Sequence, residues 1–287
     1  MKSYTIKKNI NILSNQKHIL AEGPIWDFKN QRFFFVDIKK NNFFIFKKNL
    51  LKKYQIKKKI TSIILTNDEN RLILITYNSI VIFDLKKKRI IKTLFQSNFI
   101  RERFNDSYIL DDKIILISSM DNFEKKKIGK LYLFDKFKKK AILLKNFIIG
   151  NGIDYCDLKD KFYFSISDLN LIISFELKRN KIIKKKNFFK IPKNFGIPDG
   201  ITVDKKGFIW VSCYSGGRII RISQKGKINL SIKVPTKFPT SLCFGGKNLN
   251  NILITSASEK KINKLASVYL YKSKFVGKKT NYSKIIY

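Results

Sequence analysis

The sequence is poor in acidic residues, in histidine and in cysteine. Its 287 residues include 21 Asp and Glu against 60 Lys and Arg, one histidine and three cysteines. The cysteines, Cys156, Cys213 and Cys243, are far apart and contain no C-x-x-C pair of the zinc or redox type. The histidine, His18, has no Ser or Cys partner at a matching repeat position, so we do not expect a histidine-based catalytic triad.

Long apolar runs are also missing. No apolar stretch reaches the ~18 residues that a membrane-spanning helix needs. Lys and Asn interrupt the first residues, where a secretory signal would carry its apolar core. The hydrophobic content of 44% is nevertheless that of a globular protein. We therefore expect a soluble, cytoplasmic protein, monomeric and without a membrane partner.

The formal net charge of +39 raises the possibility of a nucleic acid or another anionic surface as partner. Only eight of the basic residues are arginine, the residue that favours base reading and bidentate phosphate recognition. The lysines lie in short runs between strand-like segments, as in solvated turns and edge strands. This pattern favours compositional drift toward Lys, Ile, Asn and Phe, with a polyanion site as the alternative. We expect no specific nucleic-acid partner.

The apolar residues alternate, or run continuously over short segments, in the manner of β-strands. A weak repeat of roughly 45–50 residues joins a short strand, a polar turn and a bulky apolar strand, and this spacing suits a four-stranded propeller blade. We predict an all-β fold, a six-bladed β-propeller forming a single domain over residues 1–287, with a β-sandwich as the alternative. The repeat is seen in GPIWDFKNQRFFFVDI, TSIILTNDENRLILITY, GIDYCDLKDKFYFSIS, GITVDKKGFIWVSCY and SLCFGGKNLNNILITS.

Three of the predicted turns before inner strands carry an oxygen-bearing side chain beside glycine or proline. These side chains are Glu22, Asn151 and Asp199, and each stands at the same offset from its repeat. Each is also a common turn residue when taken alone. If the repeats superpose around a central channel, the three side chains converge. Two carboxylates and one amide carbonyl suit Ca²⁺, Mg²⁺ or Mn²⁺ better than Zn²⁺.

Four segments of the chain resemble the SMP-30/gluconolactonase/regucalcin family. The resemblance implies a six-bladed propeller with one divalent cation in its channel, Ca²⁺ first, with Mn²⁺, Mg²⁺ or Zn²⁺ as alternatives. It also implies hydrolysis of sugar-acid lactones. It places Glu22, Asn151 and Asp199 on the family's metal ligands, and Asp199 also on the residue held to act as base. The segments are LAEGPIWDFKNQRFFFVDI, NGIDYCDLKDKFYFSISDLNLIISFEL, GIPDGITVDKKGFIWVSCYSGGRIIRI and PTSLCFGGKNLNNILITSA.

A further segment, RERFNDSYILDDKIILISSM, resembles the substrate loop of the family. The resemblance places Arg103 and Asn105 at substrate-contacting positions. The common acidic pocket residue that follows is replaced by DNFEKK, and we take Asp121 as its substitute, with Asn122 or Glu124 as alternatives. The expected function is a metal-dependent, gluconolactonase-type hydrolase whose partner is a small sugar lactone. The alternative is a non-catalytic calcium-binding or regulatory protein of the regucalcin type.

Overall fold

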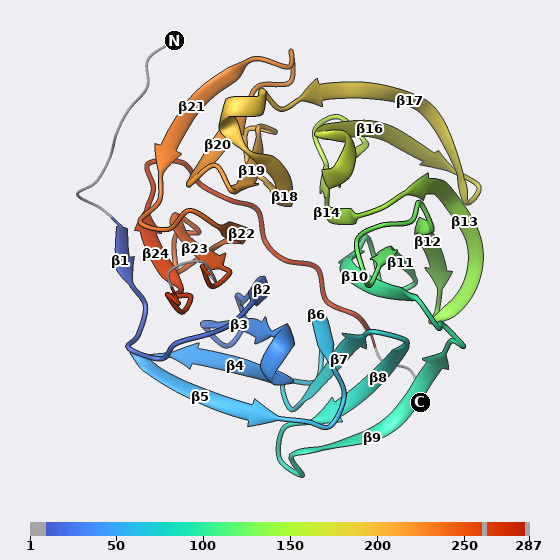
Figure 1. Ribbon diagram of the computed structural model, residues 1–287. Coiled ribbons are helices and arrows are strands. Elements are labelled where there is room, and N and C mark those ends of the chain that lie inside the picture. Colours follow the sequence, from blue (N-terminus) through green and yellow to red (C-terminus); the bar gives the residue numbers. More distant parts are fainter. Residues whose placement is uncertain (1–9, 260–262, 285–287) are drawn as a thin grey trace.

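The computed structural model describes residues 10–259 and 263–284. These residues form six four-stranded antiparallel sheets, arranged as blades around a central axis (Figure 1). The predicted all-β, six-bladed propeller is confirmed. The single domain predicted over residues 1–287 includes residues 1–9, 260–262 and 285–287, which lie outside the described residues.

Each blade runs from an innermost strand at the channel to an outermost strand at the rim. Blades 1 and 2 contain β2 (Ala21–Asp27), β3 (Arg32–Asp37), β4 (Asn42–Lys47), β5 (Leu50–Gln55), β6 (Ile60–Leu65), β7 (Arg71–Thr76), β8 (Ser79–Asp84) and β9 (Arg89–Gln96). Blades 3 and 4 contain β10 (Glu102–Ile109), β11 (Ile114–Asp121), β12 (Gly129–Asp135), β13 (Lys138–Phe147), β14 (Gly150–Cys156), β15 (Lys161–Ile166), β16 (Leu171–Lys178) and β17 (Lys181–Lys190). Blades 5 and 6 contain β18 (Ile197–Val203), β19 (Ile209–Tyr214), β20 (Arg218–Ile222), β21 (Ile228–Lys233), β22 (Pro239–Gly245), β23 (Asn251–Ser256), β24 (Tyr269–Lys272) and β1 (Ile10–Ile12).

Three short 3₁₀ helices, η1 (Ile38–Lys40), η2 (Ser167–Leu169) and η3 (Lys193–Phe195), occur in the described connections. None of the helices in the described ranges is long and apolar enough to cross a membrane.

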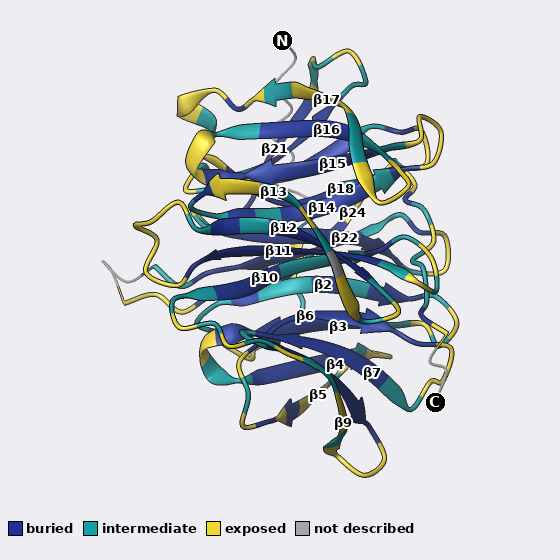
Figure 2. Cartoon of the chain, turned by 90° about the vertical axis from the view of Figure 1, so that its right-hand side faces the viewer, coloured by how far each residue is buried: buried dark blue, intermediate teal, exposed yellow. Residues whose placement is uncertain are grey.

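Burial explains the two kinds of strand composition. β8 is buried at every position, because the middle strands of a blade are covered on both faces by the neighbouring blades. β17 has no buried position and carries four lysines among its first six residues. Figure 2 shows the same contrast, with dark blue strands inside and yellow segments at the periphery. Several of the lysine runs are therefore outer strands, whose charges discourage pairing with another edge.

Both ends of the described chain tie the ring together. β1 pairs with β24, so the N-terminal strand completes the last blade. After β24 the chain crosses the middle of the ring, seen as the dark red segment in Figure 1. This C-terminal strap, residues 273–284, forms bridges to Asp204 in blade 5 through Gly277 and to Thr66 in blade 2 through Ser283. The strap therefore lies over the central channel.

Candidate functional site

The same irregularity occurs in the innermost strand of every blade. Its pairing register with the second strand slips by one residue near its beginning. Such a bulge turns a side chain away from the regular alternation, here toward the channel. The predicted ligands thus lie within or beside bulged inner strands and not in turns before them. The slips fall at Glu22/Ile25, Ile60/Ser62, Phe104/Ser107, Gly150/Ile153, Pro198/Ile201 and Pro239/Leu242.

The glycines that follow two of these residues have a packing role. A Cβ added at Gly152 would stand 2.4 Å from the backbone nitrogen of Ile201 in the next inner strand. A Cβ at Gly200 would stand 2.5 Å from the Cβ of Ser241 in the strand after that. Only glycine permits this approach. The Asn-Gly and Asp-Gly pairs are therefore explained by the close spacing of inner strands, which draws their polar side chains together.

A cavity of about 650 Å³ opens in the channel. Five of the six predicted site residues line it. They come from the innermost strands of four different blades: Glu22 on β2, Arg103 and Asn105 on β10, Asn151 on β14 and Asp199 on β18.

A chain of hydrogen bonds links three of these side chains. Arg103 Nη1 donates to Asn105 Oδ1 at 2.7 Å. Asn105 Nδ2 donates in turn to Asn151 Oδ1 at 3.1 Å and to the carbonyl of Gly150 at 2.9 Å. Asn151 Nδ2 donates to Ser167 Oγ at 3.2 Å. The Asn151 amide is thereby oriented, and its carbonyl oxygen keeps a second lone pair for another partner.

The carboxylates of Glu22 and Asp199, two of the four that line the cavity, are poorly compensated. Burial raises the pKa of Asp199 well above its usual range, and the charges of Glu22 and Asp106 raise it further. Burial, followed by the charge of Asp106, raises the pKa of Glu22 to about 8, although the N–H of Gly23 donates to its Oε2 at 3.0 Å. Burial also lowers the pKa of Arg103, the cationic residue among the five predicted site residues that line the cavity. The cavity therefore favours the arrival of additional positive charge.

This donor set fits a hard divalent cation. Asp199 is 6% exposed, and within the described part of the chain its Oδ1 has no hydrogen-bond partner, which is costly for a buried oxygen. Within the described ranges, no three His, Cys, Asp or Glu side chains are grouped as metal ligands. A cation here would therefore require the amide oxygen of Asn151 besides the carboxylates of Glu22 and Asp199, and oxygen ligands of this kind suit Ca²⁺, Mg²⁺ or Mn²⁺.

Asp121, taken from the sequence as a substrate contact, does not line this cavity. Its carboxylate is fully buried and accepts hydrogen bonds from Arg101 Nε at 2.7 Å and from the N–H groups of Lys125 and Lys126 at 2.8 and 2.7 Å. The Arg101 guanidinium holds the pKa of Asp121 far below its usual range. Asp121 orders the loop, and Glu124, an alternative from the sequence, lines the cavity instead.

Sequence reasoning missed the apolar part of the cavity wall. Ile197 and Phe238 line it, and no motif marked either residue. Tyr214, which lines it too, is the residue paired with Ile197 across β18 and β19. The other aromatic residue of that strand, Trp210, packs inside the blade and donates from Nε1 to Asp204 Oδ2 at 3.0 Å. A strand pattern marks both aromatics as apolar but does not indicate which one reaches the channel.

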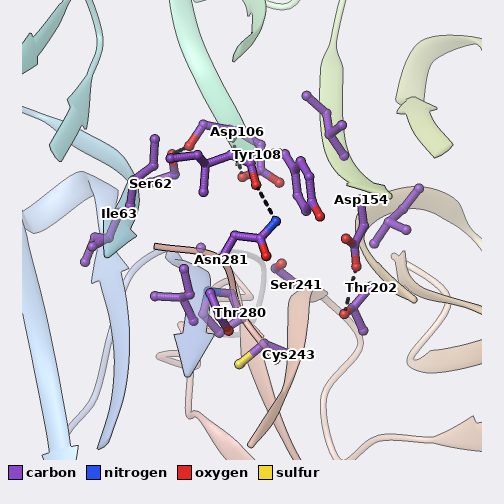
Figure 3. Close-up of a pocket in the computed structure, with 18 of the residues that line it drawn as sticks. Ser62, Ile63, Asp106, Tyr108, Asp154, Thr202, Ser241, Cys243, Thr280 and Asn281 are labelled. Carbon is purple, nitrogen blue, oxygen red and sulfur yellow. Dashed lines mark hydrogen bonds between the residues drawn. The ribbon is translucent and has the colours of Figure 1, made fainter. Parts of the chain in front are cut away.

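A second cavity, of about 120 Å³, lies against the C-terminal strap (Figure 3). Asp106 and Asp154 contribute carboxylates to its wall, and the strap contributes Lys278 and Asn281. Lys278 Nζ pairs with Asp154 Oδ1 at 2.9 Å, and Asn281 Nδ2 donates to the carbonyl of Leu110 at 2.7 Å. The strap is therefore fastened by ionic and backbone contacts to the inner strands that it covers.

Comparison with known proteins gives a consistent result. A family model described as SMP-30/Gluconolactonase/LRE-like region matches residues 20–258. Regucalcin of Gallus gallus is 38% identical over 115 residues, which are 39% of this chain and only 38% of that relative. YvrE of Bacillus subtilis (strain 168), named as a candidate sugar lactone lactonase, is 25% identical over 259 residues, 88% of each chain. The solved structure of a calcium-binding protein, regucalcin, from Agrobacterium tumefaciens str. C58 has a TM-score of 0.92 at 17% identity, covering 99% of this chain and 100% of that one, and shows the shared fold.

Proposed function

The chain belongs to the SMP-30/gluconolactonase/LRE-like family, and from that premise we propose that it is a divalent-cation-dependent hydrolase that opens sugar-acid lactones. The observation that carries the proposal is the convergence of Glu22, Asn151 and Asp199 in one channel cavity, with Asp199 Oδ1 buried and without a partner. The relatives named for lactonase activity support the same reaction class.

Glu22, Asn151 and Asp199 would hold the cation, with Ca²⁺ as the first candidate. When bound, the cation supplies Lewis-acid polarisation of the lactone carbonyl. Arg103 and Asn105 would hold the ring hydroxyls, since Arg103 keeps further N–H donors beyond the one directed at Asn105. These contacts orient the ring for attack.

Asp199 would act as the general base. The attacking water gives a proton to the carboxylate while its oxygen forms a bond to the carbonyl carbon. The bond between that carbon and the ring oxygen then breaks, and the ring oxygen takes up the proton that Asp199 accepted, which restores the carboxylate and gives the open hydroxy acid. A carboxylate positioned beside the attacking water can accept its proton in the transition state. Glu124 would accept a hydrogen bond from a substrate hydroxyl at the wall of the cavity.

The decisive experiment measures acid release from a panel of lactones after exhaustive chelation, with Ca²⁺, Mn²⁺, Mg²⁺ and Zn²⁺ each added back. We expect hydrolysis that is absent in EDTA and restored by at least one oxygen-preferring cation. Full activity that survives exhaustive chelation would contradict the cation requirement. Cation binding without turnover of any lactone would favour the alternative, a non-catalytic calcium-binding protein of the regucalcin type.

We also propose that the chain acts as a cytoplasmic monomer on a small sugar lactone. Support for the monomer comes from the lysine-rich outer strands, which blunt edge-to-edge pairing. The dispersal of lysines around the rim argues against a specific nucleic-acid site, which would concentrate basic side chains on one face.

A further inference from the structure

The channel cavity has a polar depth, and its mouth combines an apolar patch with the exposed charged side chains of Lys39, Glu124 and Lys237. In the depth, Asp199 is 6% exposed and Arg103 is 7% exposed. Toward the mouth, Ile197 is 37% exposed although it is a large aliphatic residue in the same strand as Asp199. An exposed aliphatic side chain in a functional cavity is a position for an apolar contact.

Ile197 belongs to a continuous apolar surface. It pairs with Tyr214 across β18 and β19. The Tyr214 and Phe238 rings then stand 5.0 Å apart between centroids, inclined at 42°. All three residues line the cavity, and we call them the apolar rim. The rim begins two residues from the proposed base, so a substrate held at Asp199 lies next to it.

The cavity is also larger than a small polar ring requires. Its volume of about 650 Å³ lies in the range of roughly 300–1,000 Å³ that holds drug-sized ligands. Aliphatic residues of blade 1, namely Ile19, Leu20 and Ile38, contribute to the wall as well. A lactone ring in the polar depth would leave the rim uncovered unless it carried a substituent.

We propose that the site also accepts lactones that carry an aliphatic or aromatic substituent, with the ring bound in the polar depth and the substituent on the apolar rim. This inference rests on the proposed lactonase function and extends its substrate range beyond sugar-acid lactones. Each substituent methylene that leaves water at the rim should raise kcat/KM about fourfold, if its burial is fully realised in the transition state.

The test compares three six-membered lactones with the cation-loaded protein: δ-valerolactone, which has no substituent, δ-decalactone, which has a pentyl chain, and δ-gluconolactone. With three methylenes covered, kcat/KM for δ-decalactone should exceed that for δ-valerolactone by roughly 50-fold. δ-Gluconolactone tests the proposed sugar-lactone activity separately. A ratio of decalactone to valerolactone near one would overturn the inference, because the rim would then contribute nothing to binding of the substituent.

Variants locate the effect. Ile197→Ser should lower the ratio of decalactone to valerolactone about tenfold, and Ile197→Val should keep most of it, because valine retains the apolar contact. The matched control is Leu169→Ser, since Leu169 is 44% exposed and does not line the cavity. An Ile197→Ser ratio equal to that of wild type would also overturn the inference. If no lactone is hydrolysed with any cation, the proposed function itself fails, which is a distinguishable result.

Discussion

Replacing Asp199 by Asn should change stability and cation binding in opposite directions. Burial raises the pKa of the Asp199 carboxylate, the neighbouring charges of Glu22 and Asp106 raise it further, and its Oδ1 has no partner among the described residues. In the absence of a cation, a buried group of this kind costs about 1–3 kcal/mol. The Asn amide removes the charge but adds an N–H₂ group that needs a partner. We therefore expect the free energy of unfolding to rise by the lower limit of this range, about 1 kcal/mol, or roughly 2–4 °C in Tm.

With a cation present, the wild-type protein should instead be more stable than the Asp199→Asn variant. A cation at 100 times its Kd stabilises the wild-type protein by about 2.7 kcal/mol, or roughly 5–10 °C in Tm. Asp199→Asn removes one of two anionic ligands. The affinity of the variant for the cation should therefore fall by more than the ~10–100-fold typical when only a residue that hydrogen-bonds to a ligand is lost. Its kcat should fall by at least ~10² because the general base is lost as well.

The assay is differential scanning calorimetry at pH 8.5, in EDTA and in Ca²⁺ or Mn²⁺, together with steady-state lactone kinetics. The matched control is Asp106→Asn, the same chemical change at a neighbouring carboxylate outside the proposed ligand set. It should raise Tm in EDTA and keep most of the cation-induced shift. The reasoning is refuted if Asp199→Asn keeps near-wild-type turnover, or if it shows the full cation-induced shift.

Four further predictions concern the rest of the site and the surface. Arg103→Ala should lower kcat/KM more for a hydroxyl-rich lactone than for a lactone without hydroxyls. Mn²⁺ affinity, measured by calorimetry, should stay the same or improve because a nearby positive charge is lost. Release of the metal by this variant would contradict the role given to Arg103. The pKa of Glu22 is raised from 4.5 to about 8, so between these pH values the metal-free folded protein binds more protons than the unfolded chain. The stability of the metal-free protein should therefore fall as pH rises from 4.5 to about 8, and the Ca²⁺-induced Tm shift should grow. A Tm shift that does not depend on pH would argue against Glu22 as a ligand. Lys278→Met removes the cationic partner, at 2.9 Å, of the Asp154 carboxylate, which is 8% exposed. The free energy of unfolding in urea should fall by roughly 2–3 kcal/mol, a value moderated by the 20% exposure of the lysine side chain. An unchanged unfolding midpoint would show that the strap is not held by this pair. Binding to DNA or RNA, followed by fluorescence anisotropy, should be weak, independent of sequence and lost at ~0.2 M salt; a sequence-dependent complex at that salt would point to a dedicated site.

Much of the fold could be predicted from the sequence because strand burial leaves a local signal. A strand covered on both faces must be apolar along its middle, and β3 and β8 each carry four consecutive apolar residues, FFFV and IVIF. The roughly 45–50-residue repeat then indicates blades, since each unit needs its neighbours to bury its faces. The same repeat aligned Glu22, Asn151 and Asp199, and the structure places all three on the wall of one cavity.

Other features depended on contacts between residues distant in the chain. The pairing of β1 with β24 joins the first and the last strand of the described chain. β1 has only three residues, which are too few to show a strand pattern in the sequence. Asp121 and Glu124 are both acidic and three positions apart, and only the placement of Arg101 decides that the first orders the loop while the second lines the cavity. The apolar rim arises where Ile197 pairs with Tyr214 of the neighbouring strand, whose ring contacts Phe238 from the connection before β22. The local pattern therefore determined strands, blades and ligand types, because these follow from periodicity and side-chain chemistry. The tertiary structure decided which side chains reach the channel, because bulges and the packing of neighbouring blades set their direction.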